Sequence, residues 1–313
     1  MVQGELNVFI FAISIILALL GILFNGTSLS FFLTLTKQGL GDWLLICLNC
    51  VDLAVCLTAT LSLGYYIKFD NDSTSFENGH GDNDTETSIT GEGMYNMIAW
   101  SLFRTALILS GYVTMVLSVA RMISFVAPFY KINKQVVLLS VLGYGVCKLV
   151  LELIYRYYRF VIIHEDNYKH SNETIHFFSF TRLSVVVELS VFISVASISS
   201  LVSVVMLQRS PTDRADTVKR RATITVAIIT VLFCVFNVAF LIVFKDQVLD
   251  TAEDGPASRY HTYFIVSLIT IPLNSVLNPV VYVVRKNDLR QYVQNGVQRV
   301  RLRCGRVLRL GVR

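Results

Sequence analysis

The chain has 313 residues, of which 54% are hydrophobic and only 16% are charged, and its mean hydropathy is +0.58. Average soluble domains carry about 25% charged residues. This composition excludes an ordinary soluble domain and indicates a protein that crosses a membrane several times. The six cysteines are scattered, mostly inside apolar stretches. They favour small buried side chains over a metal site or a disulfide framework.

Seven apolar segments are long enough to span a bilayer as helices, which takes about 20 residues each. They cover residues 7–35, 43–67, 94–126, 135–158, 180–208, 218–244 and 260–284. No Gly/Ser-rich linker divides them, and no internal repeat relates them. The sequence therefore predicts one all-α membrane domain over residues 1–313. The lack of a repeat argues against transporters built from inverted repeats.

The loops between these segments differ in charge. Residues 70–92 contain seven Asp or Glu and no Lys or Arg, whereas the tail from Arg285 contains nine Lys or Arg and one Asp. Cytoplasmic loops carry the excess of Lys and Arg, so we expect a plasma-membrane protein with its N-terminus outside and its C-terminus in the cytoplasm. Three Asn-x-Ser/Thr sequons then lie outside and are predicted glycosylation sites, namely Asn71, Asn83 and Asn172.

Two of the apolar segments carry groups that lipid does not tolerate. Asp52 lies near the middle of the second segment, where a carboxylate costs roughly 2.5–3.5 kcal/mol on insertion scales. The last segment contains Asn274, Asn278 and Pro279, and a proline frees a backbone carbonyl from its helical partner. These groups are expected to face the interior of a helical bundle, where they find hydrogen-bond partners.

The run Asn278-Pro279-x-x-Tyr282 ends the last apolar segment, and a basic amphipathic stretch follows it. This end of the chain resembles the seventh helix and helix 8 of rhodopsin-like G-protein-coupled receptors, and Asn25, Asp52 and Arg121 match motifs of that family in helices 1, 2 and 3. The resemblance implies a seven-helix bundle with a cytoplasmic helix 8 over about 286–298. It also implies a receptor that converts the binding of an extracellular small molecule or peptide into activation of a heterotrimeric G protein.

The resemblance assigns roles to particular residues. It implies a sodium pocket made by Asp52, Ser110, Asn274, Ser275 and Asn278, and no other cofactor. One carboxylate with hydroxyl and amide oxygens suits a hard cation; the alternative is an Asp52 kept neutral by neighbouring amides. It implies a G-protein coupling switch at four residues, Arg121, Asn278, Pro279 and Tyr282.

Several positions depart from the family pattern. Ala120 stands where the family has an acid before Arg121, and alignment on Cys234 places Val235 at the position of a conserved switch tryptophan and Asn237 at that of a proline. These departures resemble the divergent branches of the family, such as invertebrate chemosensory or orphan receptors. They leave open a receptor-like protein that no longer signals, and a transporter or channel with a polar core around Asp52 is the other alternative.

Further charged residues lie inside the apolar segments. Arg104 and Glu188 fall in the outer halves of the third and fifth segments, and we expect Arg104 to contact an anionic part of the ligand or to pair with Glu188. Lys148, Glu152 and Arg156 share one helix face and are expected to pair with each other. The predicted ligand-binding residues are Trp100, Phe103, Arg104, Glu188 and Tyr263.

The C-terminal tail alternates arginine with valine and leucine around Cys304. It predicts contact with anionic membrane lipids and a palmitoyl chain on Cys304, the alternative being an unmodified cysteine in a basic tail. Arrestin recruitment, if it occurs, is expected to use the 209–221 loop. No enzymatic activity and no nucleic-acid partner are expected.

Overall fold

A computed structural model of the chain describes the backbone of residues 2–35, 39–76, 85–127, 129–130, 132–165, 172–209, 216–249, 257–285, 289–295 and 298. This part of the chain is all-α, as the composition and the apolar pattern predict. The long helices are α1 (Val2–Thr34), α2 (Leu40–Phe76), α3 (Thr85–Val126), α4 (Lys134–Glu165), α5 (Asn172–Arg209), α6 (Asp216–Leu249) and α7 (Ala257–Arg285).

Within the described side chains, six helical stretches are long and apolar enough to cross a membrane. They are Ala12–Thr34, Leu40–Leu61, Ser101–Val126, Lys134–Tyr157, Leu183–Arg209 and Arg220–Val238, one in each of α1 to α6. In α7 the apolar stretch Ile269–Val284 is shorter. The chain is therefore a helical protein suited to several membrane crossings. The helices run past the expected apolar segments, because helical geometry needs no apolar side chains to continue.

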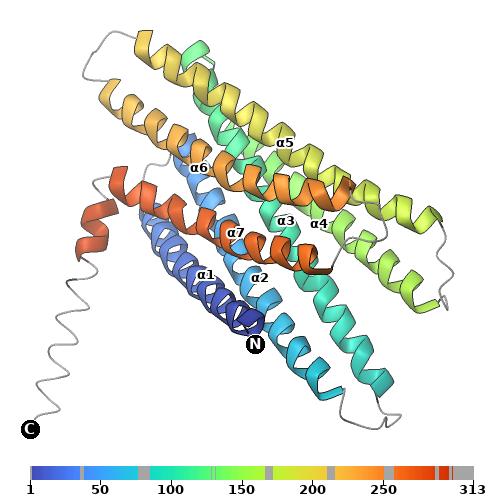
Figure 1. Cartoon of the computed structure of the whole chain (residues 1–313). Helices are drawn as coiled ribbons and strands as arrows, with labels where there is room; N and C mark the ends of the chain where they lie inside the picture. The colour runs from blue at the N-terminus through green and yellow to red at the C-terminus, as the bar shows by residue number, and fades with distance from the viewer. Residues whose placement is uncertain are drawn as a thin grey trace, which may run out of the picture.

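The helices form a bundle in which α3 is central (Figure 1). It packs on α2, α4, α5 and α6, while α1 packs on α2 and α7. The starts of α2 and α6 and the ends of α1, α5 and α7 face the same end of the bundle (Figure 1). Residues 289–295 add a short helix beyond α7. Its Leu289 is buried in the core, and the ring of Tyr292 lies 5.5 Å from that of Phe31 in α1.

Two apolar clusters fill the interior. One joins α1, α2, α3, α4, α6 and α7 around Phe32 and Tyr282, whose rings meet edge to face at 5.9 Å. The other joins α2, α3, α5, α6 and α7 around Phe103, Phe192 and Phe233. In lipid, such packing is stabilised by close van der Waals contact more than by the hydrophobic effect, because lipid is itself apolar. The interior thus depends on tight fit.

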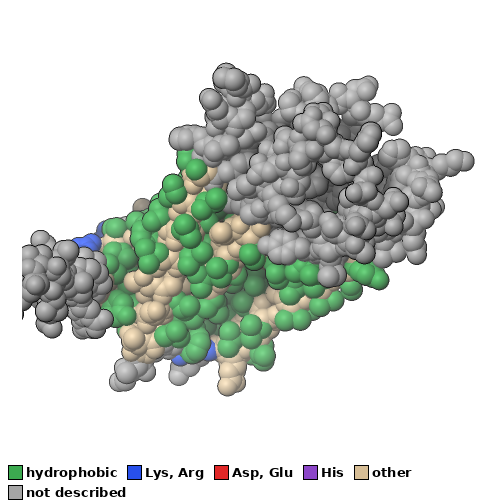
Figure 2. Space-filling view, turned by 90° about the horizontal axis from the view of Figure 1, so that it is seen from below, with side chains coloured by type: hydrophobic (Ala, Val, Ile, Leu, Met, Phe, Trp, Pro, Cys, Tyr) green, Lys and Arg blue, Asp and Glu red, His purple; other side chains and the backbone are tan. Residues whose placement is uncertain are grey.

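The outside of the described bundle is also apolar. Large aliphatic side chains such as Leu139, Leu151 and Leu201 are well exposed. Figure 2 shows one face on which hydrophobic side chains predominate, with a few Lys or Arg at its margin and no Asp or Glu among the coloured residues. A soluble protein would leave few such large apolar areas exposed. A lipid environment accounts for this surface.

Candidate functional site

Asp52 of α2 lies in the centre of the bundle with no exposed surface. Its Oδ1 accepts hydrogen bonds from the Ser110 hydroxyl of α3 at 2.9 Å and from the Ser275 hydroxyl of α7 at 3.3 Å. Its Oδ2 accepts one from Nδ2 of Asn278 at 2.7 Å. One carboxylate therefore ties three helices together. These three hydrogen bonds offset part of the hydration that the buried carboxylate has lost.

The two prolines of α7 lie inside the helix. Pro279 has no N–H to give to the carbonyl of Ser275, four residues before it. In the structure, Nδ2 of Asn25 in α1 donates to that carbonyl at 3.0 Å and also to the carbonyl of Gly21 at 2.9 Å. Asn25 thus replaces the missing helical bond and connects α1 to the cluster around Asp52, which we call the Asp52 centre (Asn25, Asp52, Ser110, Ser275 and Asn278).

Two asparagines of α7, one of them in the Asp52 centre, carry oxygen atoms with no hydrogen-bond partner among the described residues. Both Asn274 and Asn278 are buried, and the Oδ1 atom of each has no partner among the described residues. Asn274 is not among the donors to Asp52, so of the five residues expected in a sodium pocket the structure joins four by direct hydrogen bonds. Carboxylate, hydroxyl and free amide oxygens are ligands that hard cations prefer. The residues present therefore fit a sodium ion.

A second polar group bridges α3, α4 and α5, and we call it the charge network. Lys148 Nζ lies 2.8 Å from Glu188 Oε1 and 3.9 Å from Glu152 Oε1. Arg104 Nη1 lies 3.4 Å from Glu152 Oε2. The Tyr144 hydroxyl donates to Glu188 at 3.3 Å.

This arrangement corrects the expected pairing of the intramembrane charges. Arg104 pairs with Glu152 of α4, so the prediction of an Arg104–Glu188 pair is wrong. The charges of α4 do not pair only with each other either, because Lys148 is closer to Glu188 than to Glu152. Helix spacing shows which side chains share a face of α4. It carries no information on which neighbouring helix that face meets.

An aromatic layer lies next to the charge network. The rings of Tyr112 and Tyr144 stack with centroids 4.3 Å apart, and both meet Phe192 at 5.8 and 6.0 Å. Phe192 and Phe233 also lie against Gly111, where an added Cβ would sit 3.1–3.3 Å from their rings. Gly111 therefore lets α5 and α6 approach α3 closely at this level.

The orientation of α6 corrects the alignment made on Cys234. Val235 is 58% exposed, so it cannot be the switch residue at the centre of the bundle. Phe233 and Asn237 are the buried residues of this turn, and Nδ2 of Asn237 donates to the carbonyl of Phe233 at 2.8 Å. The aromatic residue of α6 in the core is therefore Phe233. The sequence alone could not distinguish Phe233 from Val235, because α6 carries apolar residues on all its faces.

A third polar group was not predicted from the sequence. The hydroxyls of Ser118 in α3 and Thr230 in α6 lie 2.9 Å apart, and the Ser200 hydroxyl of α5 donates to Thr230 at 2.9 Å. All three side chains are buried. We call them the hydroxyl cluster. Serine and threonine are common inside membrane helices because they can bond to their own backbone, so their presence alone signals little.

Arg121, near the C-terminal end of α3, lies beside the start of α2. A Cβ on Gly41 would lie 3.0 Å from its Nη2 atom, and the carboxylate of Asp42 acts on its guanidinium electrostatically. The residue before this arginine is Ala120, which carries no charge, and Asp42 supplies a negative charge from another helix.

The remaining predicted site residues are placed less fully. Phe103 is buried in the apolar cluster that contains Phe192 and Phe233. Tyr282 is buried in the other cluster, and its hydroxyl has no hydrogen-bond partner among the described residues. Four predicted residues lie in helices but their side chains are outside the described part, namely Trp100 in α3, Tyr263 in α7, Asn71 in α2 and Asn172 in α5. Asn83 and Cys304 lie outside the described residues altogether.

The chain matches no protein-family model and has no significant match among curated proteins. Any assignment of function therefore rests on the residues and their geometry.

Proposed function

We propose that the chain is a divergent rhodopsin-like receptor that couples an extracellular ligand to a heterotrimeric G protein. The observation that carries the proposal is the Asp52 centre, in which one buried carboxylate meets Ser275 and Asn278 of the Asn-Pro-x-x-Tyr helix and Ser110 of α3. Asn25 completes it through the carbonyl that Pro279 leaves free. A chance five-residue motif would have no reason to place its asparagine on a buried aspartate.

The proposal takes α7 as the seventh crossing, with Ile269–Val284 as its apolar part, and residues 289–295 as helix 8. The N-terminus then faces outside and the basic tail faces the cytoplasm, at the plasma membrane. Glycosylation at the three outer sequons, palmitoylation of Cys304 and arrestin recruitment remain predictions of this topology.

A bound sodium ion would be held by Asp52, with oxygen atoms of Ser110, Ser275, Asn274 and Asn278 available to it. When bound, it would supply a positive charge that stabilises the buried carboxylate without a proton. Asp52 itself orients Asn278 and thereby α7. A ligand that prefers a different placement of α7 would have to break these hydrogen bonds, which is how a two-state receptor converts binding into a change of shape.

Arg121 lies at the end of α3 that the proposed topology places in the cytoplasm, where a G protein would bind. Phe233 offers a core aromatic residue on α6, although the family's tryptophan is absent. A receptor-like protein that no longer signals is the alternative that this absence suggests.

The test is a G-protein dissociation assay in cells, first without ligand and then against panels of peptides and small molecules. We expect a signal that disappears in Arg121→Ala at equal surface expression. The matched control is Leu151→Ala, at an exposed position in the middle of α4 and away from that end of the bundle. Wild-type protein at the cell surface that activates no G protein, basally or with any panel member, would support the non-signalling alternative.

A further inference from the structure

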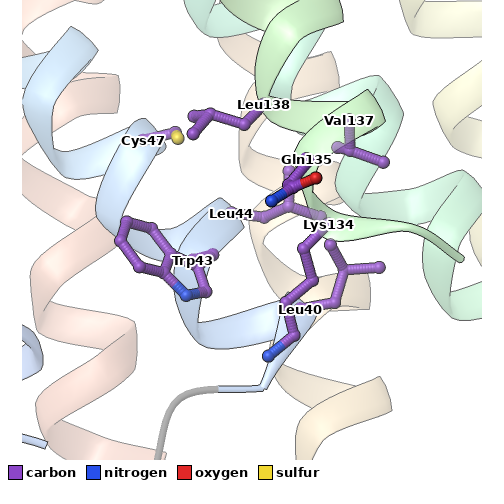
Figure 3. A pocket seen from close by; sticks show the side chains of 8 residues that line it. All are labelled: Leu40, Trp43, Leu44, Cys47, Lys134, Gln135, Val137 and Leu138. Carbon is purple, nitrogen blue, oxygen red and sulfur yellow. The ribbon is translucent and has the colours of Figure 1, made fainter.

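An apolar groove lies between the N-terminal ends of α2 and α4 (Figure 3). Its volume is about 230 Å³. It is lined by Leu40, Trp43, Leu44 and Cys47 from α2 and by Lys134, Gln135, Val137 and Leu138 from α4. In Figure 3, Cys47 and Leu138 lie toward one end of the groove, and Leu40 and Lys134 toward the other.

The groove lies at the N-terminal end of two candidate membrane spans. These are Leu40–Leu61 and Lys134–Tyr157, and the residues that line the groove come from their first turns. Trp43 is 40% exposed. Tryptophan concentrates at the level of lipid headgroups, which places this end of the groove at the membrane–water interface. Its apolar interior then lies at the depth of the acyl chains.

The polar groups of the groove are all hydrogen-bond donors or can act as donors. Lys134 has an ammonium group, Trp43 an indole N–H and Gln135 a carboxamide. No carboxylate lines the groove. A cation and two further donors at the mouth of an apolar groove match a phosphate attached to a hydrocarbon chain. An uncharged sterol would use the apolar wall but would gain nothing from the charge of Lys134.

We propose that the groove binds an anionic phospholipid, with an acyl chain along the wall formed by Leu44, Cys47 and Leu138 and the phosphate at Lys134. On the topology proposed above, this lipid belongs to the cytoplasmic leaflet, which is rich in anionic lipid. The site does not depend on whether the chain activates a G protein. In a reconstituted bilayer with the same lipids in both leaflets, the test also does not depend on the direction in which the protein is inserted.

Trp43 provides a direct probe of the site, because the chain contains only two tryptophans. In a Trp100→Phe background, the fluorescence of Trp43 is measured in bilayers of unlabelled phosphatidylcholine that contain either brominated phosphatidylglycerol or brominated phosphatidylcholine. Bromine quenches an indole that it touches. We expect half-maximal quenching at an about fivefold lower fraction of the anionic lipid, the factor that corresponds to about 1 kcal/mol for one cation near the surface.

Two pairs of variants separate the parts of the site. Lys134→Gln should abolish the preference for anionic lipid, whereas Arg220→Gln, at another exposed cation, should keep it. Cys47→Leu fills the groove and should reduce quenching by both lipids, whereas Cys50→Leu, at an exposed position one turn away, should not.

The outcomes decide the proposal in either direction. Equal quenching by the two lipids in the parent protein would overturn it, and so would a preference that survives Lys134→Gln. Unlabelled cholesterol that removes quenching by both lipids equally would identify a sterol groove and overturn the assignment to an anionic lipid. The thermal unfolding of each variant, followed by thiol labelling, identifies any variant that has lost its fold. If Lys134→Gln has lost its fold, Lys134→Met replaces it. If Cys47→Leu has lost its fold, Cys47→Val replaces it.

Discussion

In the charge network, replacement of Lys148 and replacement of Glu188 should lower the free energy of unfolding by different amounts. If Lys148 is replaced by Met, Glu188 keeps only the Tyr144 hydroxyl at 3.3 Å as a partner within the network. If Glu188 is replaced by Gln, Lys148 remains 3.9 Å from Glu152. The lysine change strands a charge and the glutamate change does not. Lys148→Met should therefore be the more destabilising.

The magnitudes follow from burial. Removal of one partner of a buried ion pair costs about 3–5 kcal/mol. The side chain of Lys148 is 8% exposed but that of Glu188 is 30% exposed, so some solvation of the stranded carboxylate remains. We therefore expect about 3 kcal/mol for Lys148→Met. For Glu188→Gln we expect about 1.5 kcal/mol, the low end for a lost hydrogen bond to a charged group.

The double variant Lys148→Met/Glu188→Gln should cost far less than the sum of the two, because neither charge is then stranded. The assay is reversible unfolding of the purified protein in bicelles by sodium dodecyl sulfate, which gives a free energy of unfolding for each variant. We expect an interaction energy of at least about 1.5 kcal/mol, within the range for residues in contact. Arg220→Met, at an exposed site, is the control and should change stability by less than about 0.5 kcal/mol. Additive single effects, or a larger cost for Glu188→Gln, would refute the reasoning.

Three further predictions test other parts of the bundle. Gly21→Ala should destabilise the protein by about 1–3 kcal/mol because its methyl group would overlap Cys56 Sγ, and Cys56→Ala should rescue it. Gly26→Ala should not destabilise the protein, because there is open space around Gly26. The bicelle unfolding assay measures all three. Asp42→Asn should raise basal G-protein activation by up to about fivefold because it weakens the restraint on Arg121, and unchanged activity at equal surface expression would contradict this. Asp52→Asn should abolish any sodium sensitivity of basal activity, measured against a matched choline salt; wild-type activity indifferent to sodium would refute the ion site.

The helical nature of the chain could be predicted from the sequence because each apolar segment is long enough to span a membrane, where the backbone must satisfy its hydrogen bonds within a helix. The ends of the helices could not, since α2 continues to Phe76 and α3 begins at Thr85, beyond the apolar segments. Four members of the Asp52 centre could also be predicted, namely Asp52, Ser110, Ser275 and Asn278. An intramembrane carboxylate requires hydrogen-bond donors, and the family resemblance indicated which residues they are. Asn274 shows the limit, since a helical position does not fix which neighbour a carboxamide meets.

The partners of the other polar residues depend on the rotation of each helix about its axis. Arg104 faces α4 rather than Glu188 of α5, and Phe233 rather than Val235 faces the core. The apolar surface of a membrane protein hides this rotation, because lipid-facing and buried positions are both hydrophobic. In a soluble helix the polar face would have revealed it. Only the structure resolves which face of α6 meets α3.

The polar residues of α3 connect this helix to different neighbours along its length. At successive levels along this helix, Arg104 meets α4, Ser110 meets Asp52 of α2, Ser118 meets Thr230 of α6, and Arg121 meets the start of α2. Each contact is specific in direction, unlike the apolar packing around it. A rotation or shift of α6 can break its bond to Ser118 while Ser110 remains bonded to Asp52. A change at the level of Ser118 therefore need not disturb the Asp52 centre, and coupling between distant sites would require this element to have two arrangements.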